Sequence, residues 1–80
     1  MGADLKELLT YIAVNLADYP DKVAVSETPR GDGVAYELRV ASEDMGKIIG
    51  RGGRIAKSIR TILRSAAGDD AKVFVDISDA

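Results

Sequence analysis

The sequence contains no cysteine, no histidine and no tryptophan. Without cysteine the chain has no disulfide and no thiol nucleophile, and without histidine it lacks the commonest general base and metal ligand. No run of about 18 or more apolar residues is present, which excludes a membrane-spanning helix, and the N-terminus lacks the basic start and apolar centre of a signal peptide. We therefore expect a cytoplasmic protein with no catalytic residue, metal, cofactor or small-molecule substrate, and no membrane contact.

The length of 80 residues indicates a single domain over residues 1–80. A chain of this size buries only about 60% of the surface that it exposes when unfolded, so its core is thin. Hydrophobic residues make up 46% and charged residues 30%, which is ordinary for a soluble globular domain. The net charge of −2 and the pI near 4.9 argue, taken alone, against a nucleic-acid binder.

Positive charge is nevertheless concentrated in one segment. Residues 45–64 contain no acidic residue and carry six of the eleven basic ones, while the other five share the rest of the chain with 13 acidic residues. The cations of the segment are Lys47, Arg51, Arg54, Lys57, Arg60 and Arg64. An approaching anion responds to this local field more than to the net charge.

The hydrophobic pattern predicts the order α-β-β-α-α-β. A first helix over residues 4–19 carries an apolar stripe at helical spacing, begins at a capping box formed by Asp4 and Glu7, and is stopped by Pro20. Residues 22–29 and 34–41 read as the strands of a β-hairpin joined by the turn sequence RGDG, and residues 72–78 as a third strand with alternating polarity.

Two further helices are expected between the hairpin and the last strand. The short one covers residues 43–49, with Ser42 as its N-cap and with Glu43 and Asp44 placing negative charge at its start. The longer one covers residues 54–67 and ends at Gly68. Its apolar side is predicted to contain Ile55, Ile59, Ile62, Leu63 and Ala66, opposite the basic side chains.

The loop Gly50-Arg51-Gly52-Gly53 between these helices has the features of a phosphate site. Glycines let the backbone approach a ligand closely, and the free N–H groups and positive dipole end of the following helix favour an anion. Arg51 and Arg54 add charge-assisted donors. A tight turn alone would explain the glycines but not the basic run around them. The motifs GxxxxGK[ST] and GxGxxG are absent, which disfavours a nucleotide-binding enzyme.

The basic side of the longer helix supports the same interpretation. Arg54, Lys57, Arg60 and Arg64 have no acidic partner one turn away, and like charges at this spacing repel each other by a few tenths of a kcal/mol per pair, roughly. A polyphosphate backbone would relieve that repulsion.

The segment IIGRGGRIAKSI, which contains this loop, resembles the signature of KH domains. Gly50 and Gly53 match the two fixed glycines, Ile48 and Ile49 the preceding aliphatic pair, and Lys57 and Ile59 later positions. Ala56 stands where many KH domains have a larger residue. Over nearly its whole length the chain also resembles the small stand-alone bacterial KH proteins of the KhpA group.

The resemblance implies a type II KH-like α+β domain, with a three-stranded sheet and three helices on one face, that binds single-stranded RNA. It also implies a homodimer, or a heteromer with a KH protein of the KhpB (Jag) type. In KH modules the loop clamps about four backbone nucleotides while the bases lie in a groove beside it. The RNA-binding residues expected from the resemblance are Lys47, Ile48, Ile49, Gly50, Arg51, Gly52, Gly53, Arg54, Ile55 and Lys57.

Other interpretations remain open. Gly50, Gly52, Ala56 and Ile59 also fit the helix-hairpin-helix pattern GxGxxxAxxh of non-specific DNA binders, although those hairpins usually lie among other helices rather than between strands. A protein-interaction module whose KH fold binds no RNA is a further alternative, favoured by the acidic pI and the dispersed aromatic residues. Asp69 and Asp70, in the loop before the last strand, would repel an RNA backbone if they flank the groove.

Overall fold

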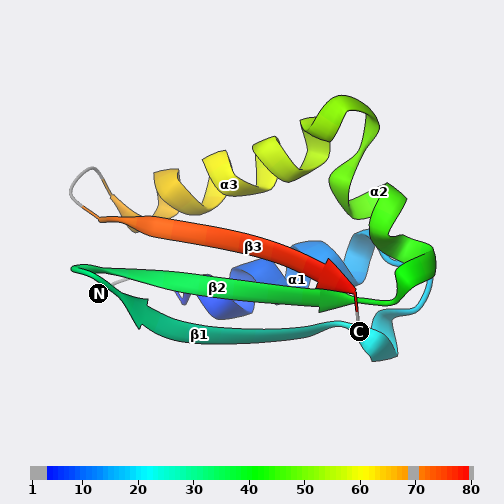
Figure 1. Cartoon of the computed structure of the whole chain (residues 1–80), viewed down its shortest axis with the longest axis horizontal. Coiled ribbons are helices and arrows are strands. Elements are labelled where there is room, and N and C mark those ends of the chain that lie inside the picture. The colour runs from blue at the N-terminus through cyan, green and yellow to red at the C-terminus, as the bar shows by residue number, and fades with distance from the viewer. Residues whose placement is uncertain (1–3, 69–70, 80) are drawn as a thin grey trace.

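The computed structural model describes residues 4–68 and 71–79. Along the chain the helices and strands are α1 (Leu5–Leu16), β1 (Ala24–Arg30), β2 (Gly33–Val40), α2 (Met45–Ile49), α3 (Arg54–Ala67) and β3 (Val73–Asp79). This order confirms the predicted α-β-β-α-α-β arrangement. Figure 1 shows the three strands side by side, with α1 behind them and α3 running alongside β3. Within the described ranges, no helix has the length and apolar character needed to cross a bilayer.

The first helix begins where the sequence predicts and ends earlier. The Asp4 side chain accepts a hydrogen bond from the backbone N–H of Glu7 at 3.1 Å, as an N-cap should. The helix ends at Leu16, not at the predicted residue 19, because Ala17 is extended. The next two N–H groups, of Asp18 and Tyr19, bond to a side chain on another part of the chain. A tertiary contact therefore ends this helix before Pro20 does.

The sheet has the order β1-β2-β3. Strands β1 and β2 form the predicted antiparallel hairpin, and its two-residue turn places Gly31 at a positive φ of 60°. Strands β2 and β3 are parallel, so the chain must cross from one end of the sheet to the other between them. Helices α2 and α3 make that crossover. The glycine loop joins these two helices, and the sheet fixes the strands on which the crossover begins and ends.

All three helices pack on one face of the sheet. The strands alternate, so that Tyr36, Leu38 and Val40 point inward while Glu37 and Arg39 point outward, as predicted. The buried core combines residues of every helix and of two strands: Leu5, Leu9, Ala13, Tyr36, Leu38, Val40, Ile48, Ile59, Leu63, Val73 and Val75. One core shared by three helices and a sheet confirms the expected fold class.

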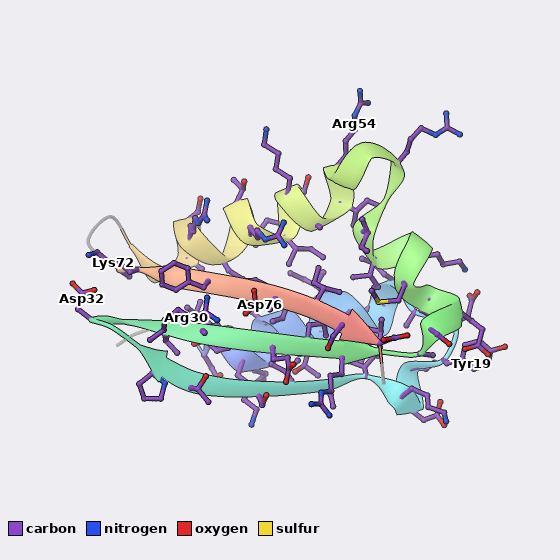
Figure 2. The ribbon with its side chains drawn as sticks, viewed as in Figure 1. Tyr19, Arg30, Asp32, Arg54, Lys72 and Asp76 are labelled. Atoms are coloured by element: carbon purple, nitrogen blue, oxygen red, sulfur yellow. The ribbon has the colours of Figure 1, made fainter. Side chains whose placement is uncertain are left out.

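The outer face of the sheet, opposite the helices, carries polar contacts. Arg30 lies 4.9 Å from the centre of the Phe74 ring and donates to Asp76 at 2.8 Å, which links β1 to β3 across β2. Figure 2 labels Arg30 on β1 and Asp76 on β3. Because the opposite charges of Arg30 and Asp76 compensate each other, this part of the face does not concentrate positive charge.

Besides the end of α1, two details of the predicted helices are wrong. Helix α3 buries Ala56, Ile59 and Leu63, whereas the exposed fractions of Ile55 and Ile62 are 36% and 45%. Ala66 is also exposed, and Ala67 packs against the core in its place. The apolar side is narrower than predicted because only the side of the helix that carries the three buried residues faces the core.

The second error concerns the start of α2. Ser42 caps no helix and instead lies inside a 3₁₀ turn over Ser42–Asp44. Its hydroxyl donates to the neighbouring Glu43 carboxylate at 3.3 Å. The N-cap position of α2 belongs to Asp44, whose side chain also makes no capping bond because it is used elsewhere.

Candidate nucleic-acid interface

The glycine loop is a single 3₁₀ turn (Arg51–Gly53) between α2 and α3. The N–H of Gly50 bonds to the carbonyl of Gly46 at 2.9 Å, which closes α2, and the N–H of Gly53 bonds to the carbonyl of Gly50 at 3.1 Å, which closes the turn. All three glycines of the loop have positive φ angles, between 66° and 78°. A left-handed conformation costs other residues about 1–2 kcal/mol each, so this backbone requires glycine.

Gly50 has a second reason to be glycine. A Cβ atom at this position would lie 2.7 Å from Cγ1 and 2.9 Å from Cβ of Ile55, on the first turn of α3. The start of α3 therefore packs directly on the backbone where α2 ends. At Gly52 and Gly53 no atom of the described residues lies within 4 Å of such a Cβ. The base of the loop is thus tightly packed, whereas its tip is open to a ligand.

The N-terminus of α3 opens onto this tip. Its N-cap is Gly53, which has no side chain to accept the N–H groups of the first turn. No acidic residue lies in that turn, so the positive end of the helix dipole is uncompensated. Arg51 and Arg54 are both exposed, and Figure 2 shows Arg54 extending away from the body of the molecule beside the loop. These groups form one concentration of donors and positive charge around an open backbone turn.

The basic side of α3 continues from the loop. Arg54 and Lys57 are exposed, and neither has an ion-pair partner among the described residues. Arg60 differs because it is half-buried and its Nε donates to the carbonyl oxygen of Val75 on β3 at 3.2 Å. The free edge of β3 is thereby bonded to the helix, and the basic side of α3 borders that edge.

The aliphatic residues around the loop have different surroundings. Ile48 is completely buried and belongs to the core, so it supports the loop from beneath. Ile49 is half-buried, and the exposed fraction of Ile55 is 36%. These two residues, and not Ile48, present apolar surface beside the loop.

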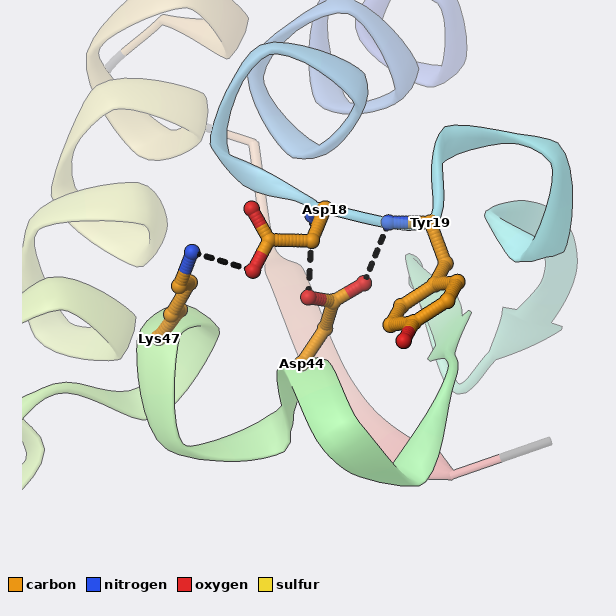
Figure 3. A network of polar contacts seen from close by, with 4 residues as sticks. All are labelled: Asp18, Tyr19, Asp44 and Lys47. Atoms are coloured by element: carbon orange, nitrogen blue, oxygen red, sulfur yellow. Dashed lines mark hydrogen bonds and ion pairs between the residues drawn. The ribbon is translucent and has the colours of Figure 1, made fainter.

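Lys47 differs from the other cations of the predicted site because it already has a partner. Its ammonium forms an ion pair with the Asp18 carboxylate, and hydrogen bonding to Asp18 raises the pKa of Lys47 despite an opposing effect of desolvation. The Asp18 backbone is held in turn by Asp44, whose carboxylate accepts from the N–H groups of Asp18 at 2.9 Å and of Tyr19 at 3.0 Å. Figure 3 shows the four residues as one network joining the end of α1 to the start of α2.

Asp44 is completely buried, and sequence reasoning missed its role. The pattern predicts a carboxylate at a helix start, which is where Asp44 lies, but it does not indicate that the side chain points toward α1. The two amides that it accepts from are 25 and 26 residues away in sequence. No local signal identifies such partners.

A cavity of about 480 Å³ lies at the other end of α3 and is not part of the loop. It is lined by Arg64, Ser65, Gly68, Ala71, Lys72, Val73 and Phe74. Lys72 is paired there with Asp32 at 3.2 Å. The predicted repulsion by Asp69 and Asp70 concerns residues outside the described part of the chain.

Comparison with known proteins gives one consistent family. A family model described as the KhpA/KhpB KH domain matches residues 6–77. A protein of Clostridium acetobutylicum named RNA-binding protein KhpA is 50% identical over 74 residues, covering 91% of this chain and 99% of the relative. Its namesake in Chlamydia trachomatis is 46% identical over 76 residues, with 94% and 97% coverage. No solved structure gives a significant match.

Proposed function

This chain belongs to the KhpA/KhpB family of KH domains, and from that premise we propose that it binds single-stranded RNA through the loop between α2 and α3. Relatives that it matches almost end to end carry the name RNA-binding protein KhpA. The observation that carries the proposal is the open turn over residues 50–53, where exposed cations and the uncapped start of α3 surround glycine backbone.

The RNA backbone would lie over the tip of this turn. The N–H groups of Arg51 and Gly52 donate to phosphate oxygens there, and the guanidinium groups of Arg51 and Arg54 supply charge-assisted bonds. The Gly53 N–H is not available, because it is bonded to the Gly50 carbonyl. Gly50 contributes the close packing that shapes the turn. Because phosphates carry no sequence information, this half of the site binds any RNA strand.

The remaining residues of the site flank the backbone. Lys57 follows Arg54 by one turn on the exposed side of α3 and extends the phosphate contacts. Ile49 and Ile55 offer apolar surface against which a base can pack. Ile48 contributes indirectly through the core. Lys47 differs from the other cations of the site because its ammonium is already paired with the Asp18 carboxylate.

The working unit is a single KH domain over residues 1–80 that acts as a binding protein and not as an enzyme. It pairs with a second copy or with a KH protein of the KhpB (Jag) type, a proposal supported by the family that contains both names. An additional copy would extend the binding surface beyond one loop. RNA as the ligand supports a place in the cytoplasm.

The double variant Arg51→Asp/Gly52→Asp tests the loop. We expect it to fold, because both positions are exposed and no described atom lies within 4 Å of a Cβ at Gly52, with a loss of stability of about 1–2 kcal/mol from a side chain at the positive φ of Gly52. It should show no detectable binding to a labelled single-stranded RNA of about 12 nucleotides, a length that exceeds the roughly four-nucleotide footprint of a KH module. Fluorescence anisotropy measures the affinity, and circular dichroism the fold.

Arg39→Asp is the control for the Arg51→Asp part of the variant, because it makes that same charge reversal on the outer face of the sheet. This variant should keep its RNA affinity. If the loop variant bound as tightly as wild type, the loop assignment would be wrong.

Salt dependence separates RNA binding from a pure interaction module. If three or four phosphates are neutralised, log K should fall with log[salt] at a slope of about −2 to −3 for a single strand. A flat response between about 50 and 200 mM salt would favour the interaction module. Preference for duplex DNA over single-stranded RNA would favour the helix-hairpin-helix alternative.

A further inference from the structure

The ion pair between Asp18 and Lys47 bears on whether the Lys47 ammonium contacts RNA phosphates, a question that rests on the proposed function. Lys47 lies three residues before Gly50 on α2, about 4.5 Å from it along the helix axis. Its flexible four-carbon stem allows the ammonium to turn toward a phosphate bound at the loop when no partner holds it. Its partner in the structure is instead the Asp18 carboxylate.

The pair is held by the fold on both sides. Asp44 is completely buried and fixes the Asp18 backbone through the N–H groups of Asp18 and Tyr19. Lys47 follows Asp44 by three residues on the same continuous helical segment. Asp44 thus bonds to the Asp18 backbone and lies on the same segment as Lys47. Because the two backbones are held close together, little chain entropy is lost when the Asp18 and Lys47 side chains pair. Most exposed ion pairs lack this preorganisation.

The location of Asp18 gives the pair a second effect. It places an exposed negative charge beside residues 45–64, which contain no acidic residue, whereas the neighbouring Asp44 is buried and accepts two N–H groups. Charges within a Debye length, about 8 Å at physiological salt, interact with little screening, whereas the other acidic residues farther from the loop are screened. A phosphate that recruits Lys47 must therefore displace the carboxylate and remain near it.

We propose that Asp18 is a positioning residue that restrains RNA affinity by holding the Lys47 ammonium away from the phosphates. In the wild type, Lys47 contributes little to RNA binding because its ammonium is paired with Asp18. Removing the Asp18 charge releases it, and one additional phosphate is then neutralised.

The test compares the affinities of four proteins for the same labelled single-stranded RNA. Asp18→Asn should bind about two- to five-fold more tightly, the range expected from one exposed ion pair, and its salt slope should steepen by about 0.7. Lys47→Gln alone removes the cation but leaves the Asp18 charge, so it should bind no more tightly than wild type. The double variant Asp18→Asn/Lys47→Gln should lose the gain and the steeper slope, which a general effect on structure would not cause.

Asp21→Asn is the matched control, because it removes one exposed negative charge from the neighbouring turn without touching Lys47. It should bind like wild type. Equal tightening by Asp18→Asn and Asp21→Asn would assign the gain to net charge and overturn the inference. So would an unchanged Asp18→Asn protein, or a double variant that binds as tightly as Asp18→Asn, since the gain would then not depend on Lys47.

The failure of this inference can be told apart from failure of the proposed function. If wild type binds RNA and Arg51→Asp/Gly52→Asp does not, the loop is supported as the RNA-binding site. An Asp18→Asn variant with wild-type RNA affinity would then refute only the role of Asp18. If wild type shows no salt-dependent RNA affinity, both are refuted. Urea unfolding of each variant checks that the affinities compare folded proteins.

Discussion

Asp44 illustrates how one side chain can fix the geometry of the candidate site. It is completely buried, and both of its carboxylate oxygens accept backbone N–H groups from the segment that follows α1. Since α2 begins directly after Asp44, these bonds set where α2 starts relative to α1. The loop at the far end of the five-residue α2 is positioned as a consequence.

Replacing Asp44 therefore tests a structural contact. Asp44→Ala leaves two part-buried N–H groups without their acceptor, and an unsatisfied buried N–H group costs about 1–3 kcal/mol. We expect the free energy of unfolding, measured with urea, to fall by roughly 2–4 kcal/mol. Asp18→Asn, which affects only an exposed ion pair, should change it by less than about 1 kcal/mol. Equal losses in the two variants would contradict this account of Asp44.

The pH dependence of stability is also decided by single residues. Burial, then the charges of Glu27 and Asp4, raise the pKa of Tyr36, and the bond to Asp18 raises the pKa of Lys47. In both cases the folded state holds its proton more tightly than the unfolded chain does. Their contribution to stability is therefore complete below the ordinary values of 10.0 and 10.5 and is lost as the pH rises above them.

We accordingly expect a nearly constant free energy of unfolding between about pH 6 and pH 9, since the chain has no histidine. It should fall above about pH 10, and Tyr36→Phe should remove part of that fall. Urea unfolding at a series of pH values measures both effects. A marked loss of stability already near pH 8 would show that another group titrates.

At the scale of elements, the loop is defined by how α3 packs on the end of α2. Gly50→Ala and Gly52→Ala place a side chain at similar positive φ angles, which costs about 1–2 kcal/mol each. Only the Cβ at Gly50 meets Ile55, at 2.7 Å. Gly50→Ala should therefore destabilise the protein by roughly 1–3 kcal/mol more than Gly52→Ala. Similar unfolding midpoints for both variants would argue against tight packing at the base of the loop.

Elements with a clear local signal could be predicted from the sequence. The alternation of Val73 and Val75 with Phe74 indicated β3, and Gly68 marked the end of α3 correctly. The loop glycines were identified because their spacing and the surrounding charge are both local features. The family resemblance then supplied the arrangement of helices on the sheet.

The remaining features depend on contacts between distant residues. The early end of α1 follows from the bonds of Asp18 and Tyr19 to Asp44. Ile62 is exposed because the core covers only the side of α3 that carries Ala56, Ile59 and Leu63. Periodicity assigns residues to a side of a helix but does not give the width of the surface that neighbouring elements cover. Such details require the assembled fold.

At the scale of the whole molecule, charge is separated along a body of 34 × 24 × 22 Å. The longest dimension is several times the Debye length of about 8 Å at physiological salt. Acidic residues at the far end, such as Asp32, therefore hardly weaken the field at the loop, although Asp18, Glu43 and Asp44 lie beside α2. A net charge of −2 is compatible with binding a polyanion on one side. The account predicts a binder with one RNA-contacting face.

Mapping of backbone amide chemical shifts during titration with the single-stranded RNA tests this central claim most directly. We predict that the largest shifts fall on residues 50–57, with smaller ones at Ile49, and that the outer face of the sheet at Ser26 and Thr28 stays unchanged. The largest shifts on α1 or on that outer face, or no shifts at saturating RNA, would contradict the account.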